Sequence, residues 1–245
     1  MDAQTSVKPL EQHYRISLKT IYSPHYTNQD LEELPCTIYT SFANPYFFGN
    51  RLYSFLKYLE NSKKKLVIVT PGYLYRYAYM ASKHINHEEG LKMAMDKQYT
   101  YINEELNPTL VSLPNLNPRI IDWEQYYKAP AFQHILQDFK SAYAKNGPFA
   151  HVMREFVCSF LKLHHQVDKE TFYESDAFKM SIEFVLEECA CFTYATVQGH
   201  PMILYPGRVF LDFDHLTKLE DCPKQLAYVA YASVIYKRKS KKKRK

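Results

Sequence analysis

Two short apolar runs, each followed by turn residues, limit the folds open to this chain. Residues 36–40 are rich in β-branched side chains and stop before Ser41, while residues 65–70 are mostly apolar and stop at Pro71 and Gly72. Residues 46–60 carry Phe and Leu at helical spacing between the two runs. A strand, a helix and a strand apolar on both faces are typical of a parallel sheet covered by helices, with a right-handed crossover. We therefore predict an α/β fold.

The remaining patterns extend this plan over most of the chain. Helical spacing covers residues 74–106 with a break near Asn86, and also 131–145, 149–165 and 168–194. Further short strands are predicted at residues 109–113, 202–205 and 226–236. The predicted organisation is a polar N-terminal arm over 1–34, a single Rossmann-like domain over 35–236 with flanking helices, and a basic C-terminal tail over 237–245.

Composition excludes several function classes. Six glycines form no Gly-rich phosphate loop, and no histidines have ligand spacing with a third partner, so neither a nucleotide cofactor nor a metal is expected. Five cysteines without a CxxC motif indicate buried thiols in a reducing compartment, here the cytoplasm. The polar N-terminus and the lack of a long apolar run predict neither a signal peptide nor a membrane span.

The positive charge is concentrated in the tail. Eight of the last nine residues are basic, and the rest of the chain has 23 basic against 26 acidic residues. Such a tail is expected to be a solvated end, and contacts that it makes with phosphates would be independent of sequence and sensitive to salt.

Ser41 is the first candidate for chemistry. It follows the first predicted strand, and open α/β sheets bind their ligands at the carboxyl ends of strands. A serine hydroxyl becomes a nucleophile when a neighbouring group takes its proton. The chain lacks the G-x-S-x-G elbow of α/β-hydrolases, which disfavours an ordinary esterase. The alternative is that Ser41 caps the following helix.

Two further positions add groups that transfer protons. Phe184 and Glu188 lie four residues apart and share one helix face, while Glu183 and Glu187 are predicted as solvated charges. A carboxylate facing the protein would have a raised pKa suited to proton transfer. Tyr205 precedes Pro206 at a strand end, so its hydroxyl can point to the same edge as Ser41. The alternatives are a glutamate on the helix surface and a tyrosine at the molecular surface.

Together these residues resemble those of the tRNA-dependent cyclodipeptide synthases. The segment from Ser41 through Asn44 to Phe47 is similar to the one around the family's nucleophilic serine, and Glu188 matches its catalytic glutamate. Tyr205 and Pro206 resemble the pair that marks the Tyr-Pro subfamily. The resemblance runs from about residue 35 to 207. It implies a Rossmann-like fold similar to the catalytic domain of class I aminoacyl-tRNA synthetases.

The resemblance also implies a reaction. Two aminoacyl-tRNAs would be the substrates, and no ATP site is needed because their esters are already activated. Ser41 would form an aminoacyl-enzyme, Asn44 would help to orient the reacting groups, Glu188 would hold the amino group and move a proton, and Tyr205 would relay a proton. No protein partner is indicated. An apolar or aromatic first amino acid is expected, in a pocket lined by Tyr39, Val67, Val69, Trp123, Phe156, Cys191 and Ile203.

The chain departs from the family pattern at three kinds of position. Phe184 and Phe132 stand where tyrosines are usual, and Tyr39 stands where a glycine is usual. The stretch that matches the basic tRNA-binding helix of some members has only Lys92 and Lys97 and is acidic overall. Contacts to tRNA are therefore expected also from Lys63, Lys64, Lys65, Lys83 and the tail. The two missing hydroxyls favour an alternative, a non-catalytic RNA-binding module on the same fold. A serine hydrolase of unrelated type is a third hypothesis, although no His–Asp arrangement is evident.

Overall fold

One mixed sheet lies at the centre of the molecule. The structure is a computed structural model, and it describes residues 10–22, 24–27, 33–62, 64–164, 173–207 and 212–239. In the described residues the sheet has six strands in the order β1-β6-β5-β2-β3-β4. Their bounds are Tyr14–Tyr22 (β1), Cys36–Tyr39 (β2), Leu66–Thr70 (β3), Arg119–Asp122 (β4), Met202–Pro206 (β5) and Ala230–Arg238 (β6).

The parallel core of the sheet confirms the predicted α/β fold. Strand β2 pairs in parallel with both β3 and β5, and β4 and β6 extend the parallel array on either side. Strand β1 pairs antiparallel with β6, at the edge of the sheet. This strand was not predicted, because residues 1–34 were assigned to an arm. Its side chains alternate between half-buried and exposed from Tyr14 to Lys19, as expected for an edge strand with one solvated face.

Helices fill most of the remaining described chain. Their bounds are Gly49–Ser62 (α2), Gly72–Lys83 (α3), His87–Tyr101 (α4), Asn107–Val111 (α5), Trp123–Tyr127 (α6), Pro130–Ala144 (α7), Pro148–His164 (α8), Asp176–Val197 (α9) and Phe213–Leu216 (α10). Short 3-10 turns cover Pro45–Phe47 and Lys224–Tyr228, and a π-helical turn covers Ile102–Leu106. The predicted break near Asn86 is confirmed, since Asn86 and Glu89 form a capping box at the start of α4.

Two predicted strands differ from the structure. Residues 109–113, predicted as a strand, lie mostly in α5, because Pro108 occupies a first-turn position where proline favours a helix. The last strand was predicted from 226, but Lys224–Tyr228 is a 3-10 turn and β6 begins at Ala230. Strand β4 was missed, since four residues are too few for a clear periodic pattern. Of the helix predicted at 168–194, residues 168–172 lie outside the described residues, as do residues 240–245 of the tail.

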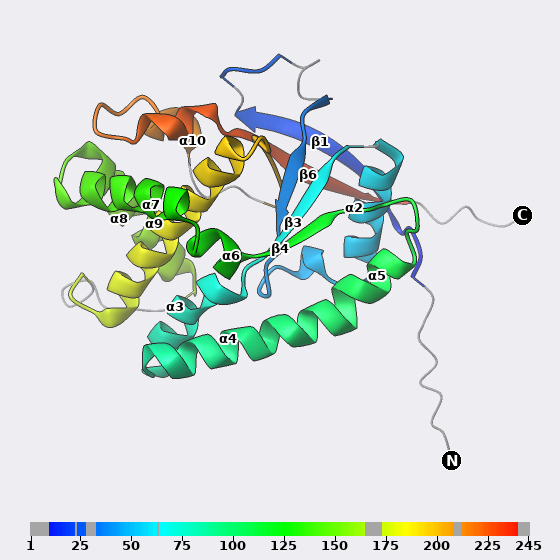
Figure 1. Ribbon diagram of the computed structural model, residues 1–245, viewed down its shortest axis with the longest axis horizontal. Coiled ribbons are helices and arrows are strands. Elements are labelled where there is room, and N and C mark those ends of the chain that lie inside the picture. The colour runs from blue at the N-terminus through cyan, green and yellow to red at the C-terminus, as the bar shows by residue number, and fades with distance from the viewer. Residues whose placement is uncertain are drawn as a thin grey trace, which may run out of the picture.

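Helices cover both faces of the sheet. Figure 1 shows α7, α8 and α9 on one side of the sheet and α2 and α5 on the other. Two buried apolar clusters match these layers, one including Val69, Phe139 and Leu186, the other including Ile68, Phe55 and Leu106. Neighbouring residues of β3 thus point into different cores, which explains why this strand is apolar throughout.

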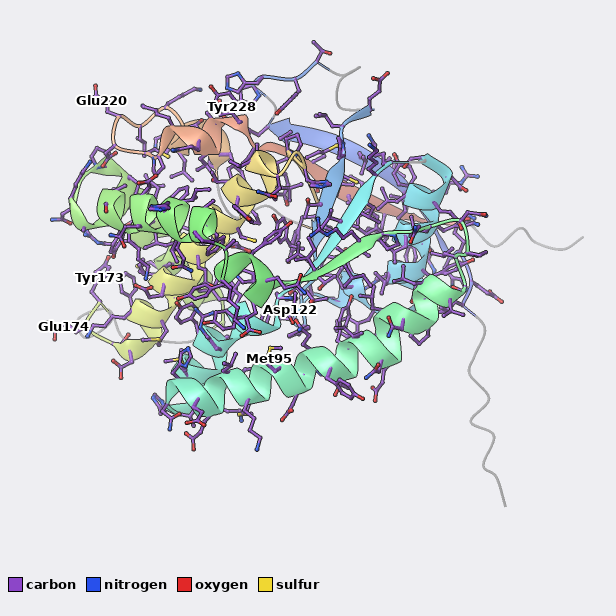
Figure 2. All side chains as sticks on the ribbon, in the orientation of Figure 1. Met95, Asp122, Tyr173, Glu174, Glu220 and Tyr228 are labelled. Carbon is purple, nitrogen blue, oxygen red and sulfur yellow. The ribbon has the colours of Figure 1, made fainter. Side chains whose placement is uncertain are left out.

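Helix α4 is joined to the parallel edge of the sheet by one glutamine. Gln98 accepts a hydrogen bond from the Gly72 backbone amide at 2.7 Å and donates to the Asp122 carboxylate. Figure 2 shows Asp122 where β4 ends, beside α4. A side chain at Gly72 would meet the Gln98 side chain within 2.9 Å, so glycine is required for this close approach of α3 and α4.

A buried ion pair holds α3 against α9. Arg76 donates to both carboxylate oxygens of Glu187, at 3.1 and 2.6 Å, and the two residues are 1% and 0% exposed. Trp123 and Tyr77 also donate to this carboxylate, at 2.9 and 3.1 Å. The rings of Tyr73 and Tyr77 lie 3.9 and 4.1 Å from the Arg76 guanidinium carbon. Both charges are therefore compensated by hydrogen bonds and aromatic faces.

Glu187 was predicted as a solvated charge, and this prediction is wrong because the residue is buried. Helix α9 contacts α3 on one side and α7 and α8 on others, so more than one of its faces is buried. Glu183 does remain partly exposed, and its carboxylate pairs with Lys140 at 2.7 Å.

The substitution Glu187→Ala should lower the free energy of unfolding by about 3–5 kcal/mol, because it leaves the Arg76 charge buried without its carboxylate. Urea unfolding of the purified protein measures this difference. Glu183→Ala is the matched control on the same helix and should cost at most about 1 kcal/mol, as expected for an exposed pair. Equal losses for the two variants would contradict a special role for the Arg76–Glu187 pair.

Candidate active site

The candidate site lies at the boundary between β2 and β5. From β2 the chain continues to β3 and β4 on one side, whereas from β5 it continues to β6 on the other. The sheet order therefore reverses between β2 and β5, and ligands of open α/β sheets bind at the carboxyl ends of strands beside such a reversal. Ser41 follows β2 by two residues, and Tyr205 and Pro206 end β5. The structure thus brings these three predicted residues to the same edge.

The Ser41 hydroxyl contacts a tyrosine of α3. Ser41 Oγ and the Tyr75 hydroxyl lie 2.7 Å apart, and Ser41 is 9% exposed. Helix α3 starts just after the carboxyl end of β3, so its first turn lies beside the end of β2. Burial raises the pKa of Tyr75 to about 12, so its phenol stays protonated at neutral pH.

Asn44, rather than Ser41, caps the element that follows β2. Its Oδ1 accepts from the Tyr46 amide at 3.0 Å, and its Nδ2 donates to the Pro206 carbonyl at 2.9 Å. The second bond joins the loop after β2 to the end of β5. Gly207 then leaves β5 with φ of +104°, a conformation that favours glycine. The alternative of a capping role for Ser41 is therefore not what the structure has.

Glu188 is a half-buried carboxylic acid on α9. Burial raises its pKa from the ordinary 4.5 to about 7, and the described residues donate no hydrogen bond to it. Its negative charge also raises the pKa of Tyr75, Tyr205 and Tyr231, so it lies within electrostatic range of all three hydroxyls. A carboxyl group with a pKa near 7 can both accept and donate a proton at neutral pH.

Tyr205 completes the polar edge. Burial raises its pKa, while side-chain hydrogen bonds with Asn44 and Ser41 act in the opposite direction. Its ring packs edge-on against Phe47, with 5.6 Å between ring centroids. Tyr205 is half-buried in this setting, which differs from the alternative of a surface tyrosine.

The two phenylalanines that replace expected tyrosines have different environments. The Phe184 ring lies edge-on to Tyr75 at 6.1 Å, next to the candidate site. Phe132 is fully buried and packs against Tyr127 and Tyr194. The hydroxyl-bearing ring beside Ser41 therefore comes from α3 instead of from either position.

The residues predicted to line a pocket belong to one apolar cluster. Tyr39 donates to the Cys191 carbonyl at 3.2 Å and packs edge-on against Trp123 and Phe192. Phe156 is partly buried against this cluster. The other members of the set are at most 4% exposed: Tyr39, Val67, Val69, Trp123, Cys191 and Ile203.

The predicted tRNA-binding lysines do not form one cluster. Lys64 and Lys65 precede β3 and lie at the amino-end edge of the sheet, a strand length of roughly 16 Å from the edge with Ser41. Lys83 ends α3, and Lys92 and Lys97 are exposed on α4. Lys63 lies outside the described residues.

Tyr75 and Arg76 were not singled out from the sequence, and Glu187 was predicted as a solvated charge. Tyr75 follows the carboxyl end of β3 just as Ser41 follows that of β2, so the same rule could have singled it out. Arg76 lies among tyrosines at positions 73, 75 and 77, and this pattern is visible in the sequence without the fold.

Other features bear on the predicted absences. In the described part of the chain, no three His, Cys, Asp or Glu side chains gather in a group that could hold a metal ion. All five cysteines are buried and unpaired. No helix within the described ranges has the length and apolar character needed to cross a membrane.

Solved structures described as cyclodipeptide synthases have a similar fold. One from Fluoribacter dumoffii aligns with a TM-score of 0.75 at 16% identity, over 92% of this chain and 100% of that one. One from Candidatus Glomeribacter gigasporarum, described as bound to Phe-tRNAPhe, aligns with a TM-score of 0.60 at 16% identity, over 86% and 89% of the two chains.

A Mycobacterium tuberculosis protein, whose description relates cyclodipeptide synthetases to type I tRNA synthetases, aligns with a TM-score of 0.66 at 14% identity, over 96% and 98%. No protein-family model and no curated protein matches this chain. At these identities the comparisons establish the fold, which is the one predicted from the sequence.

The raised pKa of Glu188 gives a prediction for stability against pH. The folded-state pKa of about 7 exceeds the ordinary 4.5. Burial of Glu188 therefore does not lower the free energy of unfolding below pH 4.5, where the acid is neutral in both states, but lowers it progressively as pH rises from 4.5 to 7. Relative to wild type, Glu188→Gln should gain up to about 3 kcal/mol in unfolding free energy over this window and then level off. Urea unfolding between pH 4 and 8 measures this, and a flat difference would contradict it.

Proposed function

We propose that this protein is an enzyme that makes a cyclic dipeptide from two aminoacyl-tRNAs through an aminoacyl ester on Ser41. The observation that carries the proposal is a serine at the β2–β5 boundary with Tyr75, Tyr205 and Glu188 around it, on a fold shared with cyclodipeptide synthases. One neighbour of this fold is described as bound to an aminoacyl-tRNA, which supports the same class of substrate here.

The first step is transfer of an aminoacyl group to Ser41. The ester carbonyl lies against Ser41 Oγ, the nucleophile attacks, and the terminal ribose of the tRNA leaves. The ester is already activated, so neither ATP nor a metal cofactor enters the scheme. Asn44 holds the loop after β2 against the end of β5 through the Pro206 carbonyl, so Ser41 and Tyr205 keep a fixed relation.

The second step uses Glu188. In its ionised form it binds the ammonium group of the attached aminoacyl moiety, and with a pKa of about 7 it can take the proton that the amine must lose before attack. The amine then attacks the second aminoacyl ester. Tyr205 relays a proton as the dipeptidyl ester on Ser41 cyclises and leaves.

The finer assignments rest on the surroundings of Ser41. The residues predicted to line the pocket, which include Tyr39 and Ile203, are mostly apolar, and this supports an apolar or aromatic first amino acid. Tyr205 and Pro206 support the Tyr-Pro subfamily. Five buried thiols support a reducing cytoplasm. Lys83, Lys92 and Lys97, on the helices that follow the carboxyl end of β3, are proposed as phosphate contacts for tRNA.

The substitution Ser41→Ala should abolish production of cyclic dipeptides, because no other group takes its place as the nucleophile. The measurement is mass spectrometry of the medium after expression in a bacterium. Ser159→Ala, an exposed serine on α8, is the matched control and should release wild-type amounts of product.

Unchanged product from Ser41→Ala would contradict the proposal. Tight tRNA binding by the wild type, without product and without a covalent intermediate in an acid quench, would favour the non-catalytic RNA-binding module.

A further inference from the structure

Tyr75 touches the atom that reacts in the proposed function. Its hydroxyl lies 2.7 Å from Ser41 Oγ, within hydrogen-bond distance. A phenol at this distance can accept the proton of the serine hydroxyl. The same phenol has its own proton to give, because its pKa is about 12.

The surroundings of Tyr75 suit a group that passes a proton on. The backbone amide of Ala43 forms a hydrogen bond that lowers the pKa of the phenol, so it favours negative charge on that oxygen. Tyr205 and Glu188 lie within electrostatic range of the same hydroxyl. The Tyr75 hydroxyl thus contacts the nucleophile directly and lies within electrostatic range of the other two proton carriers of the site.

Packing holds the Tyr75 ring in place. Phe42 lies 4.8 Å and Phe184 6.1 Å from its ring, measured between centroids. The next residue, Arg76, is bonded to Glu187, the residue before Glu188. The buried ion pair therefore fixes the register of α3 against α9, and with it the position of the Tyr75 hydroxyl relative to Glu188.

We infer that Tyr75 is a catalytic residue that shuttles the Ser41 proton during formation of the aminoacyl ester, an inference that rests on the proposed function. As the bond between Ser41 Oγ and the carbonyl carbon forms, the serine proton moves to the Tyr75 oxygen. The phenolic proton of Tyr75 moves to the ribose oxygen as the bond between that oxygen and the carbonyl carbon breaks. Tyr75 ends the step as a neutral phenol, so no outside acid or base is consumed.

This step does not depend on the hydroxyls that are missing at Phe184 and Phe132. Neither phenylalanine carries a hydroxyl, and the hydroxyl beside the nucleophile is supplied by a different helix. The site therefore needs neither missing tyrosine to move the Ser41 proton.

The test is a single-turnover reaction of purified protein with a pool of radiolabelled aminoacyl-tRNAs, quenched in acid to count the protein-bound ester. At saturating tRNA, Tyr75→Phe should form the ester about 10²-fold more slowly than wild type, in line with the usual contribution of a positioned proton-transfer group. The tRNA concentration for half-maximal rate should stay unchanged. Tyr79→Phe, one turn further along α3, is the matched control and should react at the wild-type rate.

Ester formation at the wild-type rate by Tyr75→Phe would overturn the assignment of Tyr75 and leave the proposed function standing. A slower rate that comes with an equal rise in the half-maximal tRNA concentration, or that Tyr79→Phe shares, would also overturn it. A wild-type protein that forms no ester on Ser41 would overturn the proposed function as well.

Discussion

The packing of α3 on α9 sets the geometry of the whole candidate site. Arg76 and Glu187 form the buried pair between these helices. Arg76 follows Tyr75, which contacts Ser41, and Glu187 precedes Glu188, which lies within electrostatic range of Tyr75. An ion pair of this kind adds little net stability over an apolar contact, yet it permits a single register, because any other leaves a charge buried and unpaired. The contact that restricts the helices therefore also restricts Tyr75 and Glu188.

Sheet topology supplies the other half of the site. Because the chain leaves β2 towards β3 and leaves β5 towards β6, no described connection covers the space between the carboxyl ends of β2 and β5. Ser41 and Tyr205 lie at these two ends. Asn44 joins the two strand ends, because it accepts a hydrogen bond from Tyr46 in the loop after β2 and donates one to Pro206 at the end of β5. Helix α9 then adds a carboxylic acid whose burial, rather than a charged partner, raises its pKa to about 7. Groups that are far apart in sequence thus meet at the edge of the sheet where the parallel strands β2 to β6 end.

Local pattern predicted the elements that are long or strongly periodic. The helices around Asn86 and the apolar strand β3 follow from spacing and caps within a few residues of each other. Strand β4 has only four residues, and residues 109–113 are as apolar as a strand but follow a helix-starting proline. Glu187 shows the same limit for side chains, since periodicity along α9 does not say how many neighbours that helix has.

The sequence by itself determined the α/β plan and the positions of Ser41, Glu188 and Tyr205 on their elements, because strand ends and helix faces are local properties. Only the tertiary structure decided that Asn44 is the cap, that Glu187 is buried, and that Tyr75 is the group against Ser41 Oγ. Each of these depends on which strands are neighbours and which helices cross. Contacts between residues tens of positions apart are set by packing of the whole chain, which no window of the sequence contains.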